Sequence, residues 1–143
     1  MHDLTALPAA LRADTARLLE RFDEALATAA LPRPHAPLAT RIASAFAKSL
    51  FLAEYAIRAP AEFLSMVAQA DLPRDRATYD ALLAPALEAA ADVPAAKQAL
   101  RRRRRAEMAR IAWRDLECGV PLDVVMAELS SFADATVSAA VSW

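Results

Sequence analysis

Few side chains in this sequence have the type and spacing that catalysis or metal binding needs. His2 lies at the N-terminus and His35 in a proline-rich segment, where neither is placed to act as a general base or to share a metal ion. Ser130 and Ser131 have no nearby histidine to activate a hydroxyl, and we expect the single cysteine, Cys118, to be a small packed residue. No Asp-x-Asp pair occurs, so a two-metal phosphoryl-transfer site with that spacing is missing. The residues predict no catalytic, cofactor-binding or metal site in this chain.

The strongest chemical signal is a run of five arginines in the stretch LRRRRRAEMARIAWRDL, residues 100–116. The run consists of Arg101, Arg102, Arg103, Arg104 and Arg105. Consecutive helical residues advance about 100° around the axis, so five of them cover every face and at least one must lie beside the apolar stripe. An arginine there either covers apolar surface with its stem or pairs with a carboxylate, because an unpaired buried charge is very costly.

Three interpretations of the arginine run remain open. It is a charged face of a bundle helix with one or two arginines bonded to neighbouring helix ends, a surface that docks a protein, or a site for nucleic acid or a membrane. The third is disfavoured, because no aromatic residues interleave with the arginines to stack on bases and the net charge is −1. Trp113, farther along the same stretch, is expected in the core or at an interface.

Composition points to a single helical domain. The chain has 143 residues, nine prolines and one glycine, which argues against tight β-hairpins and glycine-rich phosphate loops. The N-terminus lacks the pattern of a secretion signal, and no uncharged run approaches the roughly 20 residues that span a bilayer. One cysteine fits a reducing cytoplasm, so we expect a cytoplasmic protein. Because the net charge is −1 and no spanning run occurs, we expect binding to neither nucleic acid nor membrane.

Apolar periodicity, interrupted by prolines, predicts an all-α bundle of about six helices forming one domain over residues 1–143. The expected helices are about 8–30, 38–58, 60–70, 75–90, 94–118 and 121–142, with a proline-rich linker at 31–37. Pro85 should bend or split the fourth helix, and Gly119 should follow the end of the fifth. The last helix is apolar enough to leave a patch exposed.

Three stretches resemble one enzyme family. RRRRRAEMARIAWRDL (residues 101–116) resembles the RR-x-R-x-x-EM-x-RIAWRDL signature of the glutamine synthetase adenylyltransferase family, large bifunctional enzymes that adenylylate and deadenylylate glutamine synthetase. SLFLAEYAIRAP (residues 49–60) and LSSFADATVSAAVSW (residues 129–143) resemble two further segments of that family, in the same order. The IAWRDL element is the specific one, and the resemblance covers most of the chain from about Ile42 onward.

The resemblance implies a place and a role for the chain. In the family these helices precede the first nucleotidyltransferase domain, and this sequence stops at Trp143, before the glycine-rich Ser-Asp-x-Asp metal site. It implies a helical scaffold and docking region, inactive alone, with ATP and Mg bound by catalytic domains that this chain lacks. Glutamine synthetase and a nitrogen-signalling PII-type protein are the implied partners, and Arg114 and Asp115 are expected to brace the junction with the catalytic domain. The alternative is a stand-alone helical interaction module with an arginine-rich surface.

Overall fold

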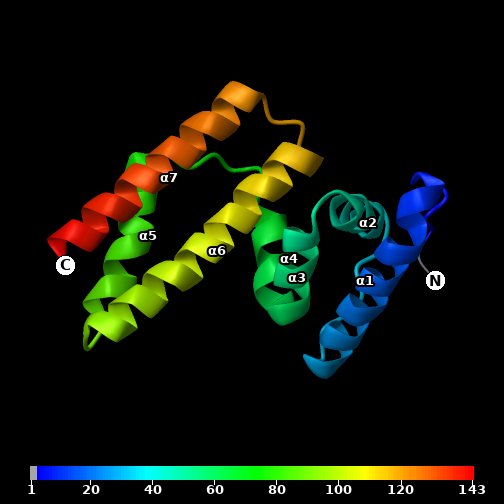
Figure 1. Ribbon diagram of the computed structural model, residues 1–143, viewed down its shortest axis with the longest axis horizontal. Coiled ribbons are helices and arrows are strands. Elements are labelled where there is room, and N and C mark those ends of the chain that lie inside the picture. The colour runs from blue at the N-terminus through cyan, green and yellow to red at the C-terminus, as the bar shows by residue number, and fades with distance from the viewer. Residues whose placement is uncertain (1–2) are drawn as a thin grey trace. The chain divides into compact units, whose positions relative to one another are not determined.

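The computed structural model describes residues 3–143, and every regular element in that range is an α-helix (Figure 1). The helices are α1 (Ala9–Thr28), α2 (Leu38–Lys48), α3 (Leu50–Arg58), α4 (Pro60–Gln69), α5 (Arg76–Glu88), α6 (Val93–Glu117) and α7 (Leu122–Ser142). The predicted all-α class is confirmed, with seven helices in the described residues where the sequence predicts about six.

The chain divides into two compact units. Unit 1 holds the described residues up to Gln69 together with Leu116–Cys118, and unit 2 holds Ala70–Asp115 and Gly119–Trp143. Each unit has its own buried side chains. The single domain expected over residues 1–143 stays a prediction.

The additional helix arises from a break at Ser49, inside the stretch 38–58 for which the sequence predicts one helix. Ser49 has extended backbone angles (φ −144°, ψ 103°), and its hydroxyl accepts a hydrogen bond from the backbone N–H of Leu52 at 3.2 Å. Serine is a preferred N-cap residue because its side chain satisfies an N–H that the first turn leaves unpaired. Apolar periodicity continues on both sides of Ser49, so the single long helix was wrong although the helical character was right.

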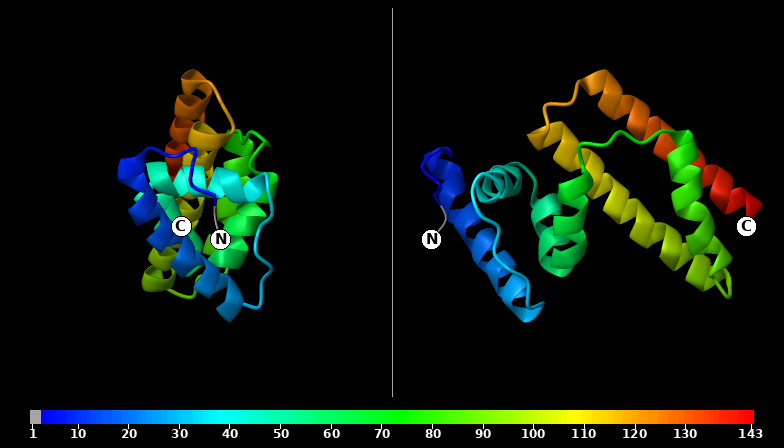
Figure 2. Two further views of the ribbon diagram at one scale, coloured as in Figure 1. Left: turned by 90° about the vertical axis from the view of Figure 1, so that its right-hand side faces the viewer. Right: turned by 180° about the vertical axis from the view of Figure 1, so that it is seen from behind.

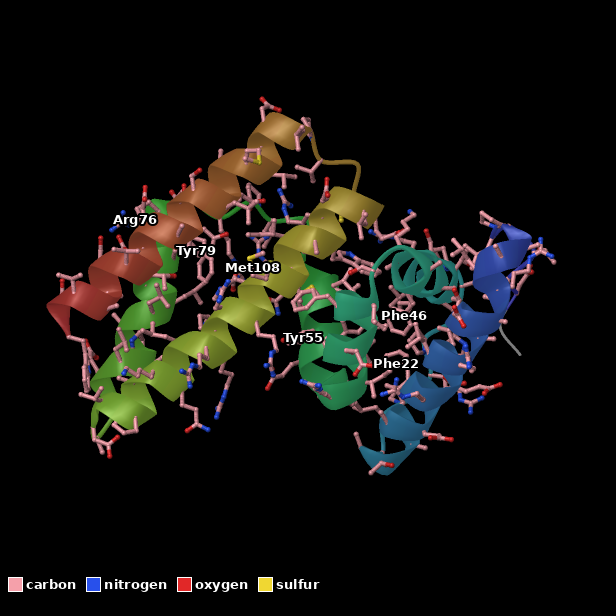
Figure 3. All side chains as sticks on the ribbon, in the orientation of Figure 1. Phe22, Phe46, Tyr55, Arg76, Tyr79 and Met108 are labelled. Carbon is pink, nitrogen blue, oxygen red and sulfur yellow. The ribbon has the colours of Figure 1, made fainter. Side chains whose placement is uncertain are left out.

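Three phenylalanines form the centre of unit 1. Phe22 of α1 meets Phe46 of α2 edge to face, with ring centroids 5.5 Å apart and an angle of 75° between the ring planes (Figure 3). Phe63 of α4 meets Phe22 at 5.7 Å and 85°. Such pairs contribute about 0.5–1.5 kcal/mol beyond the area they bury. They hold α1 against α2 and α4.

The end of α1 is closed by a backbone motif that normally uses glycine. Ala30 adopts a left-handed conformation (φ 54°). Its N–H bonds the carbonyl of Ala27 at 3.1 Å, and the N–H of Leu31 bonds the carbonyl of Leu26 at 2.9 Å. These two bonds define a Schellman motif, in which a side chain at the left-handed position is strained.

Unit 2 is built from α5, α6 up to Asp115, and α7, with α5 and α7 lying side by side (Figure 2). Tyr79 of α5 and Phe132 of α7 pack with ring centroids 5.2 Å apart, and Leu83 and Ala135 complete the cluster. Pro85 lies inside the last turn of α5, so that helix is not split.

Helix α6 has a clear signal at each end. The carboxylate of Asp92 accepts a hydrogen bond from the backbone N–H of Ala95 at 2.8 Å, as an N-cap residue does. Gly119 follows the helix with φ +63°, the left-handed conformation predicted for it. The sequence therefore locates this helix to within a residue or two.

Helix α7 buries one face and exposes another that is also apolar. Leu122, Met126, Val137 and Val141 are 70%, 53%, 63% and 82% exposed, which is the patch expected from the sequence. By length and composition α7 could cross a membrane, and 22% of its apolar stretch is buried within the structure. Its inner face carries Glu128, which is 4% exposed and paired with arginines of α6.

Candidate functional site

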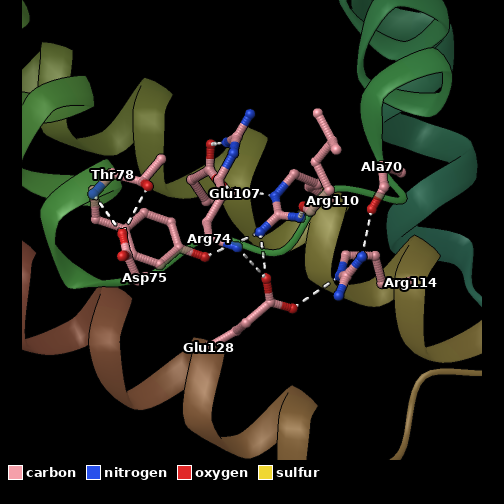
Figure 4. Close-up of polar contacts among 10 residues, drawn as sticks. Ala70, Arg74, Asp75, Thr78, Glu107, Arg110, Arg114 and Glu128 are labelled. Atoms are coloured by element: carbon pink, nitrogen blue, oxygen red, sulfur yellow. Dashed lines mark hydrogen bonds and ion pairs between the residues drawn. The ribbon is translucent and has the colours of Figure 1, made fainter.

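A group of buried charged side chains lies inside unit 2, where α6 faces α7 (Figure 4). Glu107, Arg110 and Arg114 project from one face of α6, because residues separated by three or four positions lie on the same side of a helix. Glu128 projects from α7. Each of these four side chains is at most 5% exposed. The two helices are therefore joined through charge in a place where apolar side chains are usual.

The carboxylate of Glu128 is the centre of the group. One oxygen, Oε1, accepts hydrogen bonds from Arg110 Nη2 at 2.7 Å and from the backbone N–H of Arg74 at 3.0 Å. The other oxygen, Oε2, accepts a hydrogen bond from Arg114 Nε at 2.8 Å. Both oxygens are thus occupied by donors from α6 and from the segment that leads into α5.

The guanidinium of Arg110 reaches three further partners. Its Nε donates to Glu107 Oε2 at 3.2 Å, and its Nη1 donates to the backbone carbonyl of Leu72 at 3.1 Å. Its Nη2 also donates to the hydroxyl of Tyr79 at 3.2 Å. The planar fork of arginine makes this possible, since five N–H groups leave it in fixed directions.

Two more contacts extend the network toward the segment that precedes α5. Arg114 Nη1 donates to the carbonyl of Ala70 at 2.6 Å. The second oxygen of Glu107, Oε1, pairs with the guanidinium of Arg74, whose side chain is 21% exposed. Residues 70–74, α5, α6 and α7 are therefore connected by one continuous set of hydrogen bonds.

The network is charged, and it shifts the pKa values of Glu128, Arg110 and Tyr79. Three arginines and two glutamates give a net charge of 3 − 2 = +1. Burial alone would raise the pKa of Glu128, but hydrogen bonds from Arg110, from the Arg74 backbone and from Arg114 hold this pKa below its ordinary value. Burial alone would lower the pKa of Arg110, but its bonds to Glu128 and Tyr79 raise this pKa. Burial raises the pKa of the Tyr79 hydroxyl.

This arrangement suits a structural brace better than acid–base catalysis. A general acid or base works best when its pKa lies near the working pH, whereas the pKa of Glu128 is shifted away from neutrality. The donors of Arg110 and Arg114 already point at internal acceptors. The network therefore holds three helices in register.

The arginine run lies outside this network. Arg101, Arg102, Arg104 and Arg105 are exposed and Arg103 is half-buried, and within residues 3–143 none of the five forms a hydrogen bond or ion pair. An arginine beside the buried face was expected, and Arg103 has that position, one turn before Glu107. Arginine bonds to backbone carbonyls, which one of the three interpretations assigns to the run, are made instead by Arg110 and Arg114.

The other three predicted site residues have different surroundings. Trp113 is fully buried, and Arg114 belongs to the network. Asp115 is exposed and makes no hydrogen bond or ion pair with the residues that the structure describes. The structure thus separates Arg114 from Asp115, which the sequence placed together at a junction.

Four members of the network were missed from the sequence: Arg74, Glu107, Arg110 and Glu128. A signal for three of the network residues was present as Glu-x-x-Arg-x-x-x-Arg, residues 107–114, which is one stripe of a helix. The partners on the other elements have no such signal.

The described residues contain no group of three histidine, cysteine, aspartate or glutamate side chains that could hold a metal ion. His35 is exposed, and His2 lies outside the described residues. Cys118 is half-buried, and Arg41 Nη2 lies 3.4 Å from its sulfur within unit 1.

Comparisons with known proteins agree with one another. Residues 39–143 match the family model described as glutamate-ammonia ligase adenylyltransferase. A bifunctional glutamine synthetase adenylyltransferase/adenylyl-removing enzyme of Thioalkalivibrio sulfidiphilus is 35% identical over 142 residues, covering 98% of this chain. An enzyme of the same description from Pseudomonas aeruginosa is 36% identical over 144 residues, covering 97% of the chain. The chain spans 14% of the length of each relative, and no solved structure matches it.

Proposed function

Because the chain belongs to the glutamate-ammonia ligase adenylyltransferase family, we propose that it is a helical scaffold and docking region of a bifunctional adenylyltransferase/adenylyl-removing enzyme. The proposal rests on how much of the chain, and how little of each relative, the alignments cover. Nearly the whole chain aligns with its relatives, yet it accounts for 14% of their length. A role in support of catalysis elsewhere in a longer enzyme fits that proportion.

In this proposal the chain performs no adenylyl transfer by itself. The buried charges of unit 2 form hydrogen bonds with one another, and four of the five arginines in the run are exposed, as docking requires. ATP and Mg would be bound by the catalytic domains of the parent enzyme. Glutamine synthetase is the partner that the relatives' description names, and a PII-type signalling protein is a further proposed partner. We propose a cytoplasmic site of action, without binding to nucleic acid or membrane.

A chimera tests the scaffold role. The matching segment of the Pseudomonas aeruginosa relative is replaced by this chain, and a second version lacks the segment altogether. We expect the chimera to adenylylate glutamine synthetase and the deletion to fail, with mass spectrometry of glutamine synthetase as the readout. An active deletion would contradict a scaffold role.

The isolated chain provides the complementary test. Purified chain incubated with glutamine synthetase, Mg and ATP should give no adenylylated product, and adenylylated glutamine synthetase incubated with phosphate should stay modified. Turnover in either direction would overturn the proposal that this chain lacks chemistry of its own.

A second candidate function is a stand-alone helical interaction module. The exposed arginines among residues 101–105 support it, because they pair with no side chain in the part of the chain that the structure describes. This function predicts that the chimera fails while the chain alone binds a protein partner in a stoichiometric complex that salt weakens.

A further inference from the structure

Over residues 97–105, one face of α6 carries only positive charge. Lys97, Arg101, Arg104 and Arg105 are all exposed, and we call these four residues the cationic face. Their spacing (i, i+4, i+7, i+8) places them on one side of the helix, over about 12 Å at 1.5 Å per residue. No carboxylate occurs in the sequence between Lys97 and Glu107, and Glu107 is buried in the network. The face therefore has no counter-charge within its own stretch of the helix.

Most other cations of the chain do have partners. Arginines 17, 21, 33, 74, 76, 110 and 114 and Lys48 form ion pairs, and arginines 12 and 41 donate to backbone carbonyls. The four residues of the cationic face form neither kind of bond with any described residue. Like charges at i and i+4, such as Lys97 with Arg101 and Arg101 with Arg105, destabilise a helix by a few tenths of a kcal/mol per pair. An anionic partner would remove this repulsion.

We propose that the cationic face binds an acidic protein segment whose carboxylates are spaced as on one side of a helix. This inference rests on the docking role proposed above and adds the surface and the chemistry of the partner. Three of the four cations are arginines, whose planar forks match carboxylates in two parallel hydrogen bonds. A helix holds them at fixed intervals of about one turn, so a partner helix with glutamates at the same intervals meets several of them at once.

Nucleic acid and membrane lipid fit this face less well. The residues between 97 and 107 are Gln98, alanine, leucine and arginine, with no aromatic side chain to stack on a base. No large apolar side chain on the cationic face would enter a lipid layer. The net charge of −1 also provides no general attraction to polyanions, so binding depends on local pairing.

The test uses the whole 143-residue chain and labelled synthetic peptides, with fluorescence anisotropy at low salt. One alanine-based peptide carries four glutamates at i, i+4, i+7 and i+8, and its isomer has the same composition with the glutamates spread around the helix. We expect tighter binding of the first peptide. The variant R101A/R104A/R105A should bind the first peptide about tenfold more weakly than the native chain does, as expected for the loss of three exposed ion pairs. The affinity of R101K/R104K/R105K should lie between those of the native chain and the triple alanine variant, because lysine keeps the charge but loses the planar guanidinium.

A matched control removes the same charge elsewhere. R17A/R21A/R58A replaces three exposed helical arginines outside the cationic face and should leave affinity unchanged. Circular dichroism checks the fold of each variant, and exposed arginine-to-alanine changes in a helix should preserve it. The proposal is overturned by equal loss in both triple alanine variants, by equal binding of the two peptides, or by tighter binding to duplex DNA or to phosphatidylserine vesicles.

Failure here is distinguishable from failure of the proposed function. If the chimera is active and the patterned peptide does not bind, the scaffold role stands and the assignment of this surface is wrong. If the peptide binds selectively and the chimera is inactive, the surface is assigned and the scaffold role is wrong.

Discussion

The carboxylate of Glu128 makes the most exacting prediction. It is 4% exposed and accepts three hydrogen bonds, from the side chains of Arg110 and Arg114 and from the backbone of Arg74. Glu128→Ala leaves two buried guanidiniums without their shared carboxylate. Breaking a buried ion pair in this way costs about 3–5 kcal/mol, because the remaining charge is desolvated and uncompensated. The total stability of a domain is about 5–15 kcal/mol, so the loss is a large fraction of it.

Thermal and urea unfolding followed by circular dichroism measure this loss. A chain of this length loses about 2–4 °C of melting temperature per kcal/mol, so we expect a drop of about 6–20 °C. Glu88→Ala is the matched control, since Glu88 is exposed at the end of α5 and its replacement should change stability by about 0.5 kcal/mol or less. The stability of Glu128→Gln should lie between those of Glu128→Ala and Glu88→Ala, because its amide oxygen still accepts one hydrogen bond while the charge is gone. The reasoning is refuted if Glu128→Ala costs no more than the control.

Further predictions concern pH and the helix ends. The pKa of Glu128 is lower in the folded protein than its ordinary value of 4.5. The stabilising effect of its charge is therefore complete above about pH 4.5 and is lost as the pH falls through the folded pKa. The difference in urea midpoint between the native chain and Glu128→Gln should shrink from about pH 7 to about pH 3. Ser49→Ala removes the cap at the break between α2 and α3 and should cost about 1 kcal/mol, whereas Ser49→Asp should retain most of the stability; a neutral alanine variant would mean that the cap is dispensable. Ala30→Gly relieves a left-handed alanine and should raise the free energy of unfolding by about 1 kcal/mol, and a destabilised variant would contradict the strain assigned there.

The helices could be predicted from the sequence because they depend on local information. Apolar spacing identifies the buried stripe of each helix, and residues such as Gly119 mark the ends through conformations that other residues adopt at a cost. The break at Ser49 was missed for a related reason. The apolar pattern runs across it without a change in period, and a serine inside such a pattern reads equally well as a solvent-facing helical residue.

The buried network could be predicted only in part, because its members come from different segments. Residues 107, 110 and 114 share a stripe of α6, and that spacing is visible in the sequence. Glu128, Arg74 and the carbonyl of Ala70 are brought to it by the packing of unit 2, which periodicity does not specify. The spacing of residues along a helix shows which side carries the polar side chains, but not which side other elements of the fold will bury.

The two sets of arginines on α6 differ because of their angular position on the helix. Residues 103, 107, 110 and 114 follow one another at intervals of four, three and four, so they form a row that faces the rest of unit 2. Arg103 begins this row and is the half-buried member of the run, while Arg101 and Arg105 point away from the row and stay in solvent. A buried arginine must have acceptors, and the network supplies them for Arg110 and Arg114. An exposed arginine has no such requirement, so a partner bound at the cationic face would take no hydrogen bond away from the network.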